Sequence, residues 1–133
     1  MENSDNNVGV LINNNGNSDV IVTFGGINQG IGIPVFEFFN ILSDSKFDKI
    51  FIRDFNQMWY LKGIDEEISS FNNLLDYLRS LIKDYDRVIF LGNSMGGYAA
   101  ILFGILLDVD KVISFSPQTF IGKFNRFIHF DNR

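Results

Sequence analysis

The sequence predicts an α/β fold, in which a mostly parallel β-sheet carries helices on both faces. Two observations lead to this class: short apolar runs rich in β-branched residues recur along the chain, and helix-like stretches separate them. Parallel strands require crossover connections, and strands buried on both faces read as continuous apolar runs. The length of 133 residues, with 46% hydrophobic and 20% charged residues, corresponds to one domain. We expect that domain at residues 8 to 133, after a disordered tail at residues 1 to 7 that is acidic and rich in Asn.

Two strands are expected near the N-terminus, at residues 8 to 12 and 20 to 24. Both runs are rich in Val and Ile, and residues 13 to 19 between them consist only of Asn, Gly, Ser and Asp. Clusters of these residues form turns, so the two strands are predicted to pair with each other as a hairpin.

A glycine-rich loop at residues 25 to 33 follows the second strand. Pro34 then suits the first turn of a helix, because its fixed φ and missing N–H are tolerated there. We expect this helix to run to about Leu42. The side chains that it directs inward are expected to be Phe36, Phe39 and Ile41.

The middle of the chain contains a short apolar strand at residues 50 to 52 and, later, a strongly amphipathic helix. Between them, residues 53 to 63 are polar and aromatic. The helix repeats apolar residues at the i, i+3, i+4, i+7 spacing of one buried face. Its apolar stripe consists of Phe71, Leu74, Leu75, Leu78, Leu81 and Ile82.

A strand at residues 88 to 91, an apolar helix at 98 to 107 and a strand at 112 to 115 complete the alternation. The helix is too short to cross a bilayer, which takes about 20 apolar residues. A helix that is apolar all round is instead expected inside a layered core. We therefore expect no membrane partner.

The residues Gly92-Asn93-Ser94-Met95-Gly96, between this strand and this helix, match the pattern G-x-S-x-G. A sharp turn from strand to helix exposes a serine hydroxyl above the sheet edge, where it can act as a nucleophile. Gly92 and Gly96 are the elbow glycines, which allow the turn without Cβ clashes. The alternative is that the glycines only close a tight turn and that Ser94 caps the helix.

Composition excludes several other classes of function. The formal charge is −5 with scattered Lys and Arg, which argues against nucleic-acid binding. The absence of cysteine and the single histidine argue against disulfides and most zinc sites, so we expect no metal and no cofactor. The N-terminus has no basic region followed by an apolar stretch, as a signal peptide would. We expect a cytoplasmic protein.

The chain resembles the α/β-hydrolase fold family of serine esterases, thioesterases and acyltransferases. The residues that carry the resemblance are 20 to 26, as the strand and oxyanion loop, and 88 to 97, as the strand and nucleophile elbow. The resemblance implies a three-layer sandwich of which this chain is the first part, incomplete at its C-terminus. It also implies that Ser94 is the nucleophile. The oxyanion donors would be the backbone N–H groups of Met95 and of either Gly26 or Ile27.

The acid and histidine of a triad follow the serine in this family, at the ends of further strands. After residue 115 the chain has Ser116-Pro117-Gln118, with no carboxylate. His129 is the only imidazole, with Asp131 near it, and no predicted strand brings either residue to Ser94.

Asp54, Phe55 and Trp59 follow the strand at residues 50 to 52 and are candidates for lining a pocket. They would do so at the edge of the sheet where ligands gather, outside the carboxyl ends of the strands. Packing in the core is the alternative for the two aromatic side chains.

The sequence therefore predicts a serine hydrolase that cleaves an ester, thioester or amide of a small-molecule acyl substrate through an acyl-enzyme on Ser94. It would need further C-terminal residues, and these 133 residues alone are expected to turn over poorly. An exposed strand at residues 112 to 115 would favour self-association.

Two other functions remain open. One is a hydrolase-fold module that binds a ligand without catalysis. The other is a nucleotide site, for which Asp54 follows a glycine-rich loop by about 20 residues. Val35 stands where the third glycine of that fingerprint belongs.

Overall fold

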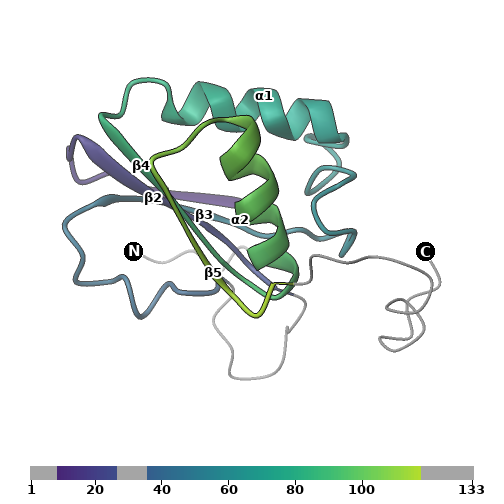
Figure 1. Cartoon of the computed structure of the whole chain (residues 1–133), viewed down its shortest axis with the longest axis horizontal. Coiled ribbons are helices and arrows are strands. Elements are labelled where there is room, and N and C mark those ends of the chain that lie inside the picture. Colours follow the sequence, from purple (N-terminus) through teal and green to yellow (C-terminus); the bar gives the residue numbers. More distant parts are fainter. Residues whose placement is uncertain (1–8, 27–35, 118–133) are drawn as a thin grey trace.

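A computed structural model describes residues 9 to 26 and 36 to 117. They form an α/β fold around a five-stranded sheet of order β1-β3-β2-β4-β5, in which only β1 is antiparallel (Figure 1). The predicted fold class is confirmed. The strands are β1 (Val10–Asn13), β2 (Asp19–Phe24), β3 (Asp48–Ile52), β4 (Arg87–Asn93) and β5 (Lys111–Phe115), and the helices are α1 (Phe71–Ile82) and α2 (Met95–Leu106).

The direction in which the chain crosses the sheet reverses at β2. From β2 the chain moves to β3 on one side, and it then returns past β2 to β4 and β5 on the other side. Right-handed crossovers in opposite directions place their connections on opposite faces of the sheet. The carboxyl ends of β2 and β4 therefore flank a topological switch point, which is where open α/β sheets bind ligands.

Helices α1 and α2 cover the same face of the sheet (Figure 1). Ser70 caps α1 by accepting a hydrogen bond from the Asn73 N–H at 3.0 Å, and the predicted amphipathic helix is confirmed. Leu74 and Leu78 of α1 are fully buried against the same cluster as Phe103 of α2. The strand residues in this cluster include Val20, Val22, Phe24, Ile50, Ile52, Val88 and Phe90.

The apolar helix begins at Met95, three residues earlier than expected, and it is not buried all round. Ala99, Ala100 and Phe103 are fully buried, whereas Ile105 is 72% exposed. Helix α2 rests on β2, β4 and β5 with one side, and no element of the described residues covers its last turn. Within the described part of the chain, no helix is both long and apolar enough to cross a membrane.

The predicted N-terminal hairpin is wrong, because β1 pairs with β3 instead of β2. Val10 lies opposite Ile52 in antiparallel register. The physical reason is a long-range anchor at Asp48, whose carboxylate accepts hydrogen bonds from the N–H groups of Asn15 at 2.8 Å and Asn17 at 3.0 Å. This holds the Asn-rich turn over the start of β3, so that β2 enters the sheet on the far side of that strand.

The helix expected from Pro34 to Leu42 is also wrong in its described part, where residues 36 to 44 form consecutive turns. Phe38 has a φ of 70°, which interrupts a right-handed helix. Phe36 and Phe39 do point inward, with ring centroids 6.3 and 5.3 Å from that of Phe51, but Ile41 is 80% exposed. This aromatic segment covers the second face of the sheet and completes three layers.

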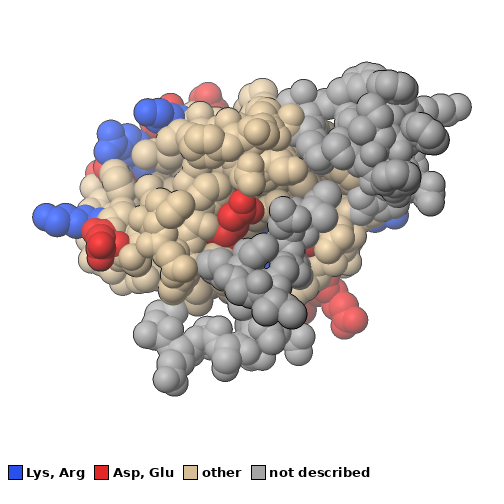
Figure 2. All heavy atoms as spheres, turned by 90° about the horizontal axis from the view of Figure 1, so that it is seen from below, with Lys and Arg blue, Asp and Glu red and all other residues tan. Residues whose placement is uncertain are grey.

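Strand β5 forms one edge of the sheet and pairs with β4 only, among the described residues. Phe115 at its end is 53% exposed. The open apolar edge that the sequence predicted is therefore present in the described part of the chain, and self-association through it stays a prediction. Figure 2 shows one face of the molecule, on which the described Lys and Arg side chains lie toward the rim and form no continuous stripe.

Candidate active site at the carboxyl edge of the sheet

Ser94 occupies a sharp turn between β4 and α2, with φ 56° and ψ −119°. An L-residue rarely adopts this conformation, which costs on the order of 1–3 kcal/mol and concentrates at functional sites. The turn is held by the Ser94 N–H, which donates to the Phe115 carbonyl at 2.9 Å, and by the Tyr98 N–H, which donates to the Ser94 carbonyl at 3.1 Å. The Ser94 side chain makes no capping hydrogen bond, so the alternative of a plain helix cap has no support.

The glycines around Ser94 are required by close packing. A Cβ on Gly96 would lie 1.9 Å from the Phe24 carbonyl oxygen, and a Cβ on Gly92 would lie 2.1 Å from the Gly96 carbonyl oxygen. At Gly97 it would lie 2.6 Å from Ser114 Oγ. Helix α2 thus starts in direct backbone contact with the end of β2, which brings Ser94 to the switch point.

Met95 follows Ser94 as the first residue of α2, and it is fully buried. Among the described residues, none accepts a hydrogen bond from its N–H. The N-terminal N–H groups of a helix lack intrahelical partners and carry partial positive charge. A free N–H next to Ser94 is the kind of donor that stabilises an oxyanion.

The Gly25-Gly26 loop lies beside the Ser94 turn. A Cβ placed on Gly26 would be 3.6 Å from Ser94 Cβ and 3.0 Å from the Asn93 carbonyl oxygen. Gly25 is held from behind, because its N–H donates to the Ile52 carbonyl at 3.0 Å and its carbonyl accepts from the Tyr60 hydroxyl at 2.8 Å. The structure therefore brings Gly26, Met95 and Ser94 together as the sequence predicted, whereas Ile27 lies outside the described residues.

Glu37 is a site residue that the sequence reasoning missed. Its carboxylate accepts the Gly26 N–H at 2.6 Å through Oε2 and the Asn93 Nδ2 at 2.8 Å through Oε1. The Gly26 N–H is thus already engaged, although it was one of the two expected oxyanion donors. One signal was available: Glu37 is the only charged residue between Gly25 and Ser43.

Asp54 has a structural position and is only 1% exposed. Its carboxylate accepts the N–H groups of Asn56 and Met58 at 2.8 Å and of Tyr60 at 3.0 Å. Burial raises the pKa of Asp54, and these N–H donors oppose the rise. The carboxylate stabilises a loop in which Gln57, Trp59 and Tyr60 have positive φ, and that loop delivers the Tyr60 hydroxyl to Gly25.

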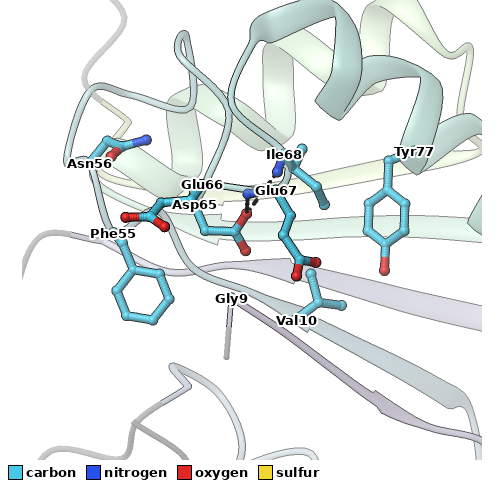
Figure 3. Close-up of a pocket in the computed structure, with 9 residues that line it drawn as sticks. All are labelled: Gly9, Val10, Phe55, Asn56, Asp65, Glu66, Glu67, Ile68 and Tyr77. Atoms are coloured by element: carbon cyan, nitrogen blue, oxygen red, sulfur yellow. Dashed lines mark hydrogen bonds between the residues drawn. The ribbon is translucent and has the colours of Figure 1, made fainter. Parts of the chain in front are cut away.

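Trp59 and Phe55 do not line a pocket at Ser94. Trp59 is 4% exposed and belongs to the main core. The Phe55 ring lies 4.1 Å from the Arg53 guanidinium carbon and lines a cavity of about 780 Å³ on the β1 side of the sheet (Figure 3). The cavity is lined by Gly9, Val10, Phe55, Asn56, Asp65, Glu66, Glu67, Ile68 and Tyr77.

This cavity is distant from Ser94. Strands β3 and β2 separate β1 from β4, and neighbouring strands lie about 4.8 Å apart, so the distance is on the order of 10 Å. Asp65 is occupied in accepting the N–H groups of Glu67 at 2.9 Å and Ile68 at 2.7 Å (Figure 3). In the described part of the chain, no three His, Cys, Asp or Glu side chains are placed to hold a metal ion.

The triad partners of Ser94 are not assigned. His129 and Asp131 lie outside the described residues. Ser116 and Pro117, which follow β5, offer no carboxylate. The described site therefore consists of a strained serine, a free helix N-terminal N–H, and a glycine loop bridged by Glu37.

Three solved structures of a capsule O-acetyltransferase of Neisseria meningitidis serogroup A are similar to this chain, whereas no family model and no curated protein matches it. The structure in complex with caged gadolinium has a TM-score of 0.68 at 18% identity over 93% of this chain. A histidine-to-alanine mutant in complex with CoA has a TM-score of 0.68 at 18% identity over 89%. A third structure has a TM-score of 0.65 at 19% identity over 93%.

The chain spans about half the length of these neighbours, which it covers to 53%, 51% and 52%. At such low identity the likeness shows the fold. The predicted resemblance to α/β-hydrolases stays a prediction, and the described residues share the α/β fold of these O-acetyltransferase structures.

Proposed function

We propose that this chain carries the nucleophile of an acyl-transfer enzyme, and that Ser94 forms the acyl-enzyme. The observation that carries the proposal is the backbone of Ser94, held at φ 56° and ψ −119° at the switch point of the sheet. A strained serine at the carboxyl end of a central strand is where an α/β sheet presents a nucleophile. The neighbouring Gly26 loop and the free Met95 N–H support it.

In the proposed first step, Ser94 Oγ attacks the carbonyl carbon of an ester, thioester or amide. The hydroxyl proton passes to a general base, and the carbonyl π electrons move to oxygen. The Met95 N–H is proposed to stabilise that oxyanion together with a second donor from the glycine loop. Collapse of the intermediate expels the alcohol, thiol or amine, which takes up the proton, and leaves an acyl group on Ser94.

The acceptor in the second step is water in a hydrolase and a substrate hydroxyl in a transferase. The structural neighbours are named as O-acetyltransferases, and one of them was solved in complex with CoA. We therefore propose a thioester of the CoA type as acyl donor, with O-acyl transfer beside the hydrolysis that the sequence predicted. Because the chain spans about half of those neighbours, donor and acceptor belong to the proposal alone.

Fluorophosphonate labelling tests the proposal, because the reagent phosphonylates only an activated serine. The product of the natural reading frame is incubated with the probe, and the modified peptide is identified by mass spectrometry. Labelling at Ser94 that disappears in Ser94→Ala supports the acyl-transfer function. Absence of labelling in the folded protein contradicts it and favours a non-catalytic binding module.

A further inference from the structure

We infer that Glu37 is a positioning residue, which clamps the glycine loop after β2 to the turn that carries Ser94. This inference rests on the proposed function and assigns a role that no sequence pattern indicated. Its basis is the bridge in which one carboxylate joins the Gly26 N–H to the Asn93 side chain.

The bridge connects the two segments that flank the switch point. Gly26 follows β2, and Asn93 is the last residue of β4, directly before Ser94. The contacts of 2.6 and 2.8 Å use a different carboxylate oxygen for each segment. Hydrogen bonds to an ionised carboxylate are shorter and stronger than neutral ones, so the clamp resists separation of the two segments.

The position that the clamp fixes is narrow. A Cβ on Gly26 would lie 3.0 Å from the Asn93 carbonyl oxygen, 3.4 Å from Glu37 Oε2 and 3.6 Å from Ser94 Cβ. The loop backbone is thus in near contact with the serine turn. A shift of about 1 Å in such a group costs up to about 100-fold in rate, because reacting atoms and donors lose alignment.

Glu37 is itself held in place by its aromatic neighbours. Phe36 is 5% exposed and packs on Phe51 of β3, and the Phe38 ring lies 6.4 Å from that of Phe115. The Phe115 carbonyl accepts the Ser94 N–H. The carboxylate therefore projects from a segment that is fixed on both sides, and it can act as a rigid spacer.

The clamp also assigns a role to Gly26. Its N–H donates to Glu37 and anchors the loop, so it is not free to stabilise an oxyanion while the clamp is closed. A positioning function thus replaces one of the two donor assignments that the sequence left open.

The test compares the second-order rate of fluorophosphonate labelling of Ser94 among matched variants. Glu37→Ala removes both contacts and is expected to slow labelling about 10- to 100-fold. Glu37→Gln keeps an acceptor oxygen and should stay close to wild type once the Asn93 amide turns to match. Asn93→Ala removes one contact and should slow labelling less, with no further loss in the double variant with Glu37→Ala. Asp44→Ala, which removes an exposed charge from the same segment, is the control.

A second measurement separates the clamp from the proposed function. Hydrogen exchange of the Gly26 amide, followed by NMR, is expected to accelerate in Glu37→Ala and to stay slow in Glu37→Gln. Wild-type-like or faster labelling of Ser94 in a folded Glu37→Ala protein overturns the inference while the proposed function stands. If wild type itself fails to label, the proposed function fails, and unchanged Gly26 exchange in Glu37→Ala then overturns the clamp on its own.

Discussion

The close approach of α2 to β2 predicts a large difference between two identical substitutions in one helix. In Gly96→Ala, the new methyl group would lie 1.9 Å from the Phe24 carbonyl oxygen, 2.5 Å from its carbon and 2.8 Å from the Gly25 oxygen. Non-bonded carbon contacts are optimal at about 3.5–4.0 Å. The backbones of α2 and β2 would therefore have to separate by more than about 1 Å.

Gly104→Ala is the matched control, since it places the same methyl group against side chains only. The nearest atoms are Val112 Cγ2 at 2.5 Å and Val109 Cγ2 at 3.3 Å, and both valines can adjust. The helix gains roughly 0.5–1 kcal/mol when alanine replaces an interior glycine. We expect this gain to offset most of the crowding at Gly104.

Overpacking a core costs typically 1–3 kcal/mol, and backbone atoms that cannot rotate away place Gly96→Ala at about 3 kcal/mol or above. For a domain of this size each kcal/mol corresponds to roughly 3–6 °C in Tm, so we expect a fall of about 10 °C or more. Thermal and urea unfolding followed by circular dichroism measure both variants. A Gly96→Ala protein within about 1 kcal/mol of wild type, or no less stable than Gly104→Ala, would refute the close approach.

Three further predictions concern the residues around the site. Ser94→Gly relieves the positive φ and should stabilise the fold by about 1 kcal/mol relative to Ser94→Ala, and equal Tm values would contradict the strain. Tyr60→Phe leaves the buried Gly25 carbonyl without its 2.8 Å donor and should cost about 1–3 kcal/mol in urea unfolding, so an unchanged midpoint would count against that anchor. Burial raises the pKa of Asp54 above its ordinary value of about 3.8, so its folded form binds a proton more tightly than the unfolded chain does. The stability that this provides is present below that ordinary pKa and lost as pH rises through the raised one. The Tm of wild type minus that of Asp54→Asn should therefore fall with rising pH, and a difference that is constant or rises would refute this sign.

Local patterns were sufficient where one segment decides its own structure. The apolar stripe from Phe71 to Ile82 predicted α1, because a 3.6-residue period needs only one buried face. The apolar run before Ser94 predicted β4, and the G-x-S-x-G pattern predicted its junction with α2. Each of these features depends on residues that are close together in the sequence.

Features that depend on distant partners could not be predicted. Asp48 moves β1 away from β2 through hydrogen bonds to Asn15 and Asn17, which lie more than 30 residues earlier. Phe36 and Phe39 are spaced as in a helix, yet packing on Phe51 determines the path of that segment.

The candidate site shows the same limit. Ser94 and Met95 were found from a local motif, whereas Glu37 reaches Asn93 across 56 residues and Tyr60 reaches Gly25 across 35. No spacing rule connects such pairs, so only the folded structure reveals them.

The account depends most on Ser94 as the atom that accepts an acyl group. The most direct measurement is the intact mass of the folded protein after brief exposure to an acetyl thioester or an activated acetyl ester, followed by peptide mapping. We predict one acetyl group on Ser94, which accumulates rapidly, disappears on addition of a hydroxyl acceptor, and is absent in Ser94→Ala. Acetylation at another residue, or none in a protein that is folded and carries its natural C-terminal sequence, would contradict the central claim.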